Sequence, residues 1–128
     1  MQGGESGTIG AEAIPGDAMS EAPAIQLNHL NLPARDPEGL ARWYAETFGL
    51  RADRHLVRGP GVLIAFVPGE PVNRAPELHL GLNVPSMTAL EEWAGKFGKQ
   101  IRVGPEFASF QISDPDGNCI EVYAKASG

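Results

Sequence analysis

The chain has 128 residues, of which 42% are hydrophobic and 20% charged, a composition typical of one ordinary globular domain. No apolar run approaches the roughly 18 residues that a membrane helix requires. The net charge of −6 and the lack of a Lys/Arg cluster argue against nucleic acid and anionic membranes as partners. The single cysteine, Cys119, rules out an internal disulfide and agrees with a reducing, cytoplasmic location.

Residues 1–24 are expected to be a flexible leader. They contain seven Gly or Pro residues and four acidic residues but no Lys or Arg, so they can neither pack a core nor act as a signal or transit peptide. Met19 is an alternative start site, which leaves open whether residues 1–18 belong to the natural protein. The expected domain covers residues 25–125 and is followed by a short tail, 126–128.

An internal repeat organises the expected domain. Residues 28–43, NHLNLPARDPEGLARW, align without gaps on residues 78–93, LHLGLNVPSMTALEEW, at a constant offset of 50. Chance would supply about one identity in such a window. The alignment has five, which pair His29 with His79, Leu30 with Leu80, Leu32 with Leu82, Leu40 with Leu90 and Trp43 with Trp93. The sequence therefore predicts two duplicated modules, at about 25–76 and 77–125.

Each copy is expected to begin as a strand and to continue into a helix. In the first copy Asp36 is a good N-cap before Pro37, and the following apolar stripe ends at Gly49. In the second copy Ser86 caps a helix that ends at Gly98. The stripes consist of Leu40, Trp43, Tyr44 and Phe48 in the first helix and Leu90, Trp93, Ala94 and Phe97 in the second. We interpret these aromatic residues as packing of helix on sheet, without a chemical role.

Shorter extended segments follow each helix. After the second helix these are 101–107, 108–113 and 118–124, and the sequence DPDG predicts a turn that joins the last two into a hairpin. After the first helix they are 51–57 and 62–67, followed by the linker PGEPVNRAPE. Each module is thus a strand, a helix and two or three further strands, and the first module is expected to be one strand short.

Two of the predicted strands carry polar residues on one face. Because successive side chains of a strand point to opposite faces, His79, Gly81 and Asn83 lie opposite Leu78, Leu80, Leu82 and Val84. In the last strand Glu121 shares a face with Cys119 and Tyr123. A carboxylate at the centre of a strand is expensive to bury unless it is paired or bound to a metal.

Two similar modules that join their sheets into one curved surface would bring His29, His79 and Glu121 together. Two imidazoles and a carboxylate form a facial triad for a divalent metal and leave positions open for water or a chelating substrate. The alternative interpretation is two repeat-derived histidines of the core and an edge-strand glutamate, since buried histidines are commonly just hydrogen-bonded.

Three segments of the chain resemble the signature segments of the vicinal oxygen chelate superfamily, the glyoxalase/bleomycin resistance/dioxygenase proteins. They are LNHLNLPARDPEGLARWYAETFGL, LHLGLNVPSMTALEEW and FQISDPDGNCIEVY, and the resemblance covers about residues 25–125. It implies an α+β fold of paired βαβββ modules that form a cup-shaped mixed sheet. It also implies one divalent ion (Zn, Ni, Mn or Fe(II)) on His29, His79 and Glu121, and a homodimer in which modules of two chains complete each site.

The resemblance implies a metal-dependent lyase, isomerase or thiol transferase that acts on a small chelating substrate. A metal that binds two neighbouring oxygens stabilises an enolate or alkoxide, or orients an epoxide or catecholate. Glyoxalase I carries a fourth ligand late in the first module, where the nearby acids are Glu70 and Glu77, and fosfomycin-type transferases carry threonine where Asn31 stands. The alternatives are a ring-cleaving extradiol-type dioxygenase and a metal-free bleomycin-resistance-type protein that sequesters a small molecule.

The catalytic residue is not determined by the sequence. The candidates are Glu77, His55 and Tyr123, and the expected pocket residues are Asn31, Gly81, Asn83, Cys119 and Tyr123. Arg51, Arg54 and Arg58 are candidates for binding an anionic group of the substrate, although clustered charges are usually a solvated face.

Overall fold

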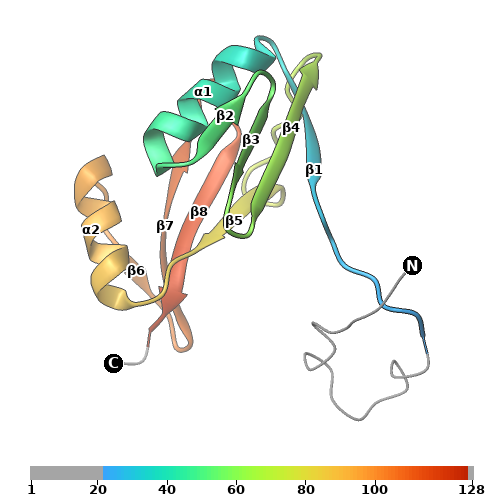
Figure 1. Cartoon of the computed structure of the whole chain (residues 1–128). Coiled ribbons are helices and arrows are strands. Elements are labelled where there is room, and N and C mark those ends of the chain that lie inside the picture. The colour runs from blue at the N-terminus through green and yellow to red at the C-terminus, as the bar shows by residue number, and fades with distance from the viewer. Residues whose placement is uncertain (1–21, 127–128) are drawn as a thin grey trace.

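The computed structural model describes residues 22–126, so residues 1–21 of the expected leader, with Met19, and residues 127–128 lie outside the described residues. The first module contains β1 (Leu30–Ala34), α1 (Pro37–Phe48), β2 (Arg51–Asp53), β3 (Leu56–Gly59) and β4 (Val62–Pro68). The second contains β5 (His79–Asn83), α2 (Met87–Phe97), β6 (Arg102–Val103), β7 (Phe107–Ser113) and β8 (Cys119–Lys125). The order strand, helix and three strands occurs twice (Figure 1), which confirms the predicted α+β fold of paired modules.

The two sheets have the same topology. Their strand orders are β1-β4-β3-β2 and β5-β8-β7-β6. In each, the first strand pairs in parallel with the last, and the other pairs are antiparallel. The helices cover one face of the sheets in Figure 1, which leaves the other face free for a binding site. No helix in the described part of the chain is long and apolar enough to cross a membrane.

Local signals place both helices. The side chains of Asp36 and Ser86 each accept a hydrogen bond of 3.1 Å from the backbone N–H three residues ahead, as the N-cap prediction requires. Gly49 and Gly98 end the helices with φ angles of 72° and 64°. This left-handed conformation is strained for residues with a Cβ, so the two glycines are the terminators that the sequence indicates.

The first module differs from the sequence prediction in its strand division. Where the sequence indicates one strand over 51–57, the structure has a hairpin of two short strands in which Asp53 pairs with Leu56. The sequence does not signal this turn, because Arg54 has a positive φ of 61°, a conformation that Gly or Asn usually adopts in two-residue hairpin loops. The sheet of the first module therefore has four strands, as in the second module. Two of them, β2 and β3, are only three and four residues long, so the sequence predicts them as one strand.

The aromatic residues of the helices form the contact between the modules. The ring of Phe48 in α1 lies 5.7 Å from that of Trp93 and 6.1 Å from that of Phe97 in α2. Between helices and sheets, Tyr44 of α1, Leu90 of α2, and the strand residues Phe66 and Ile120 are among the largest fully buried side chains. Burial of these residues is the main stabilising contribution to the fold, which confirms the packing role predicted for the helical aromatics.

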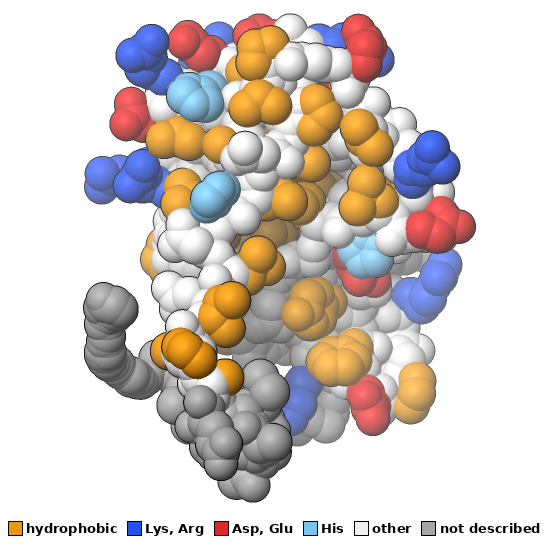
Figure 2. Space-filling view, turned by 90° about the vertical axis from the view of Figure 1, so that its right-hand side faces the viewer, with side chains coloured by type: hydrophobic (Ala, Val, Ile, Leu, Met, Phe, Trp, Pro, Cys, Tyr) orange, Lys and Arg blue, Asp and Glu red, His pale blue; other side chains and the backbone are white. Residues whose placement is uncertain are grey.

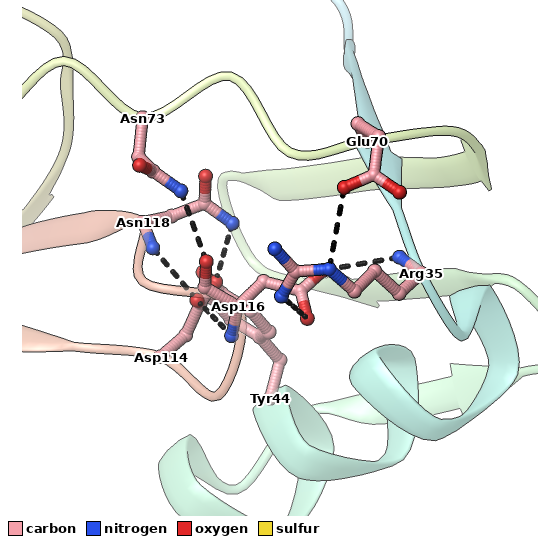
Figure 3. A network of polar contacts seen from close by, with 7 residues as sticks. All are labelled: Arg35, Tyr44, Glu70, Asn73, Asp114, Asp116 and Asn118. Atoms are coloured by element: carbon pink, nitrogen blue, oxygen red, sulfur yellow. Dashed lines mark hydrogen bonds and ion pairs between the residues drawn. The ribbon is translucent and has the colours of Figure 1, made fainter.

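A buried hydrogen-bond network also joins the modules (Figure 3). The Tyr44 hydroxyl of α1 donates to Asp114 Oδ2 at 2.6 Å, and Asp114 Oδ1 accepts the backbone N–H groups of Asp116 and Asn118 at 2.9 Å each. Burial, and then the hydrogen bond to Asp114, raise the pKa of Tyr44 above its usual value. The DPDGN segment therefore forms the predicted turn and in addition fixes the second module against the first.

The rim of this network is more exposed. The backbone N–H of Arg35 donates to Asp116 Oδ2 at 3.1 Å, and Asn73 Nδ2 of the linker donates to the Asp116 carbonyl at 2.9 Å. Arg35 Nε also lies 3.4 Å from Glu70 Oε1, a pair so exposed that it contributes little stability. These contacts connect the start of α1 and the linker to the same turn (Figure 3).

No strand pair joins the two sheets within residues 22–126. Among the described strands, β1 and β5 each have a neighbour on one side alone, so both leave a free edge. Residues 22–29 form an extended arm before β1 and leave Ile25 and Leu27 90% and 94% exposed (Figure 1). The strand pairs of one chain therefore do not form the single curved surface that the three-ligand prediction requires.

Candidate metal centre

Two of the three predicted ligands meet on the open face of the second sheet. His79 begins β5 and Glu121 lies in β8, and the parallel register of these strands places Glu121 beside Gly81. The Nε2 atom of His79 lies 3.3 Å from Glu121 Oε1, and about a third of each side chain is exposed. The alternation predicted for β5 is confirmed, since Leu80 and Leu82 pack against the core on the opposite face. Leu78 departs from it, because it precedes the strand and is 47% exposed.

A backbone carbonyl orients the His79 ring. The Nδ1 atom of His79 lies 2.8 Å from the carbonyl oxygen of Pro76. Because a carbonyl accepts and cannot donate, Nδ1 carries the proton of this hydrogen bond. In the neutral imidazole the lone pair is then on Nε2, the atom that faces Glu121. This is the orientation of a metal-ligating histidine whose other nitrogen is held by a hydrogen bond.

The distance between the two donor atoms fits a shared metal ion. Zinc binds histidine nitrogen at about 2.0–2.1 Å and carboxylate oxygen at about 2.0–2.2 Å. Two such ligands separated by the 3.3 Å found between His79 and Glu121 subtend an angle of about 105° at the metal. That angle is close to tetrahedral, and a small rotation of either side chain reaches the 90° of an octahedral site.

His29 does not join this pair within one chain. It is exposed on the arm before β1, where its Nδ1 atom lies 3.2 Å from Asn28 Oδ1. Within residues 22–126 no group of three or more His, Cys, Asp or Glu side chains is close enough to hold a metal ion. In Figure 2 the imidazoles are spread over one face, and one of them lies against an acidic side chain. Within the described part of one chain, two of the three predicted ligands lie together and the third does not.

The strand register shows that the first module lacks a counterpart of Glu121. Gly81 pairs with Glu121 in the second sheet, and Asn31, which aligns with Gly81, pairs with Ala65 in the first. Ala65 therefore occupies in β4 the position that Glu121 occupies in β8. A methyl group cannot coordinate a metal, so this position supplies no fourth ligand. The 50-residue offset does not reveal it, because the modules differ in length between their first and last strands.

The two other acids considered as fourth ligands are placed away from strand faces. The Glu70 side chain is 85% exposed and forms its ion pair with Arg35. Glu77 lies in the turn before β5, so the alternation that put it on the face of His79 does not apply there. His55 forms part of the exposed turn between β2 and β3. Among the described residues, none of these three joins His79 and Glu121 in a cluster that could hold a metal ion.

Aromatic residues cover the sheet beside the His79–Glu121 pair. A Cβ atom at Gly81 would lie 3.5 Å from Tyr123 Cε1, so the Tyr123 ring occupies the space that the glycine leaves free. The Phe107 ring meets that of Tyr123 edge to face, with 5.7 Å between centroids. Asn83 Nδ2 donates to the Tyr123 carbonyl at 3.3 Å. Phe107, which the sequence did not indicate, is therefore a further candidate for contact with a bound molecule.

Cys119 is on the same strand as Glu121 but is buried. Burial, and then the charge of Glu121, raise the pKa of its thiol. A thiol must lose its proton to ligate a metal, so these two effects disfavour Cys119 as a ligand.

Comparison with solved structures identifies the architecture. The oxidase ChaP-H1 is 22% identical with a TM-score of 0.64, over 79% of this chain and 96% of that one. A glyoxalase/bleomycin resistance protein/dioxygenase from Alicyclobacillus acidocaldarius is 20% identical with a TM-score of 0.61, over 80% and 92%. The chain has the glyoxalase/bleomycin resistance/dioxygenase fold. A lactoylglutathione lyase from Agrobacterium tumefaciens shares this fold at 17% identity and a TM-score of 0.56, over 80% and 95%.

The sequence matches no model of a known protein family and no curated protein. The glyoxalase fold is the architecture of the vicinal oxygen chelate superfamily that the three sequence segments resemble, so the predicted recognition is confirmed at the level of the fold. Because these neighbours include both an oxidase and a lyase, the fold does not select a reaction.

Proposed function

We propose that the protein is a divalent-metal-dependent enzyme of the vicinal oxygen chelate type, a lyase, isomerase or thiol transferase that acts on a small chelating molecule. The observation that carries the proposal is the 3.3 Å contact between His79 Nε2 and Glu121 Oε1, with the ring of His79 held by Pro76. A surface ion pair does not require that the imidazole ring is held in one orientation. A metal-ligating histidine benefits from it, because the lone pair of its nitrogen must point at the metal.

His29 of a second copy is the proposed third ligand, so that each site of a homodimer combines modules of two chains. The free edges of β1 and β5 support this assembly, because an unpaired strand edge is a template for another strand. The groove along β5 has a volume of about 380 Å³ and is bounded on its other side by Pro60, Gly61 and Val62. An arm with exposed apolar residues at every second position, Ile25 and Leu27, is suited to such an edge.

Three protein ligands leave coordination positions open for two substrate oxygens. A bound divalent ion polarises such oxygens and stabilises the negative charge that develops on them. His79 and Glu121 would hold the ion beside those oxygens, and Ala65, the counterpart of Glu121 in the first module, supplies no coordinating group. Tyr123 stands two residues from Glu121 on the same face of β8, from where its phenol donates a hydrogen bond to a substrate oxygen.

The separation of His29 from the pair favours a second candidate, a metal-free bleomycin-resistance-type protein that sequesters a small molecule. In that case the apolar residues of the open face bind the ligand, and His79 and Glu121 form a plain ion pair. An extradiol-type dioxygenase remains the alternative enzyme, distinguished by iron(II) and oxygen consumption.

Metal analysis of the protein purified without chelator, together with its molar mass in solution, tests the proposal. We expect one Zn, Ni or Mn per chain in a dimer, lost in His79→Ala and strongly reduced in His29→Ala. His55→Ala is the matched control, because this histidine lies in an exposed turn and should leave the metal content unchanged. A metal-free dimer under every loading condition would refute the proposal.

Activity assays then separate the reactions. A panel of methylglyoxal with glutathione, fosfomycin with thiols, and catechols with oxygen covers the enzyme candidates. Iron(II) with oxygen uptake on catechols would replace the lyase or transferase assignment by a dioxygenase. Tight binding of a hydrophobic drug by the metal-free protein would favour the sequestering function.

A further inference from the structure

Two arginines lie directly opposite each other on adjacent strands at one edge of the first sheet. Arg51 of β2 and Arg58 of β3 are cross-strand partners, and both are exposed. Like charges in directly opposed positions destabilise a sheet. Neither arginine forms an ion pair within residues 22–126, although Asp53 is on the same face two residues from Arg51. In a chain of net charge −6, an uncompensated cationic pair is a feature that needs a counter-charge.

The pair borders a hollow of about 330 Å³. Its lining consists of Gly49, Leu50, Arg51, Arg58, Gly59 and Pro60. At Gly49 a Cβ atom would meet open space, whereas at Gly59 the Leu50 side chain fills the space above the backbone. Two guanidinium groups beside such a hollow offer several N–H donors to one carboxylate or phosphate, the geometry in which arginine binds anions best.

The strand registers place the arginine pair on the face of the first sheet that corresponds, by the equivalence of the two modules, to the face of the second sheet that carries His79 and Glu121. Arg58 pairs with Leu63, and Leu56 pairs with Ala65. Paired residues share a face, and residues two apart on one strand share it as well, so Arg58 lies on the face of Ala65. Diagonal neighbours of this kind are separated by roughly 7–8 Å, within the reach of an arginine side chain. Ala65 is the counterpart of Glu121, so its surroundings face the cup.

We propose that Arg51 and Arg58 bind an anionic group of the cup's ligand, a carboxylate or a phosphate attached at the end remote from the metal. The apolar side chains of Leu63 and Val67 in β4 lie on the same face between the arginines and β1, and together with Leu56 of β3 they contact the body of such a molecule. The substrate class is therefore a small chelator with an apolar middle and an anionic end. This assignment rests on the proposed function, since in the proposed dimer the first module of one chain, with its arginines and His29, shares a cup with His79 and Glu121 of the second copy.

Titration with inorganic phosphate and, separately, with acetate tests the anion site by calorimetry or NMR. Both titrations use the full chain, metal-loaded and metal-free, at low ionic strength, because exposed charges are screened by salt. We expect saturable binding that Arg58→Gln and Arg51→Gln each weaken about tenfold or more, and that Arg58→Lys weakens less, because it keeps the charge but loses the paired donors. Arg42→Gln, an exposed arginine of α1, is the control and should bind like the wild type.

The anion used identifies the group. Stronger binding of phosphate indicates a phosphate-bearing ligand, and stronger binding of acetate indicates a carboxylate. Absence of saturable binding of either anion, or equal binding by Arg58→Gln and wild type, would overturn the proposal. Metal content is measured on the same samples. Anion binding that depends on Arg58 in a protein that never takes up metal would remove the proposed enzyme function while keeping the anion site.

Discussion

Replacement of Tyr44 by phenylalanine tests how the modules are held together. The Tyr44 hydroxyl is buried and donates its hydrogen bond of 2.6 Å to Asp114 Oδ2, across the boundary between α1 and the turn before β8. Tyr44→Phe keeps the ring, whose centroid lies 5.3 Å from that of Phe66, so the packing of the core remains. The variant therefore removes one hydrogen bond without creating a large cavity.

The magnitude follows from the charge of the acceptor. The hydroxyl-to-oxygen distance of 2.6 Å is in the range of charge-assisted bonds, which are roughly twice as strong as neutral ones. Asp114 keeps its other donors, the N–H groups of Asp116 and Asn118 and the Asn118 side chain at 2.8 Å, so its carboxylate is not left unpaired. Loss of a hydrogen bond to a charged group lowers the free energy of unfolding by about 2 kcal/mol.

Chemical denaturation and thermal unfolding measure this loss. For a domain of about 100 residues, 2 kcal/mol corresponds to a decrease in Tm of roughly 10 °C. Tyr123→Phe is the matched control, because its phenol makes no hydrogen bond in the described part of the chain and should change the free energy of unfolding by less than about 0.5 kcal/mol. A Tyr44→Phe variant as stable as the control would show that the network does not hold the modules together.

Three further predictions concern single positions. Gly98→Ala should destabilise the protein by about 1 kcal/mol, because Gly98 has a positive φ. Gly95→Ala should stabilise it by roughly 0.5–1 kcal/mol, because Gly95 lies inside α2 and a Cβ there meets open space. Urea titrations that give both variants a change of the same sign would contradict the reasoning. Because the pKa of Cys119 is raised, its alkylation by iodoacetamide should be slower than that of free cysteine at about pH 8.5, and Glu121→Gln should accelerate it. Ala65→Glu places a carboxylate opposite the proposed metal and should slow metal release to a chelator; an unchanged rate would argue against the position of Ala65 in the cup.

Local features of this fold were predictable because they depend on neighbouring residues. Asp36 and Ser86 cap helices through contacts three residues away, and the turn at 114–117 is set by its own side chain and glycine. The repeat likewise needs no coordinates, since His29 and His79 align by counting alone. Arg54 is the local exception, because an arginine with a positive φ leaves no turn signal in the sequence.

The sequence by itself determined the two modules, their helices and the candidate ligands, because periodicity, caps and duplication are properties of short stretches of chain. The tertiary structure decided which distant groups meet. It paired Tyr44 with Asp114 across 70 residues, placed Ala65 where the first module would need a glutamate, and brought Glu121 to His79 but not to His29. Strand register and the packing of one module on another set these contacts, and both depend on the whole chain folding at once.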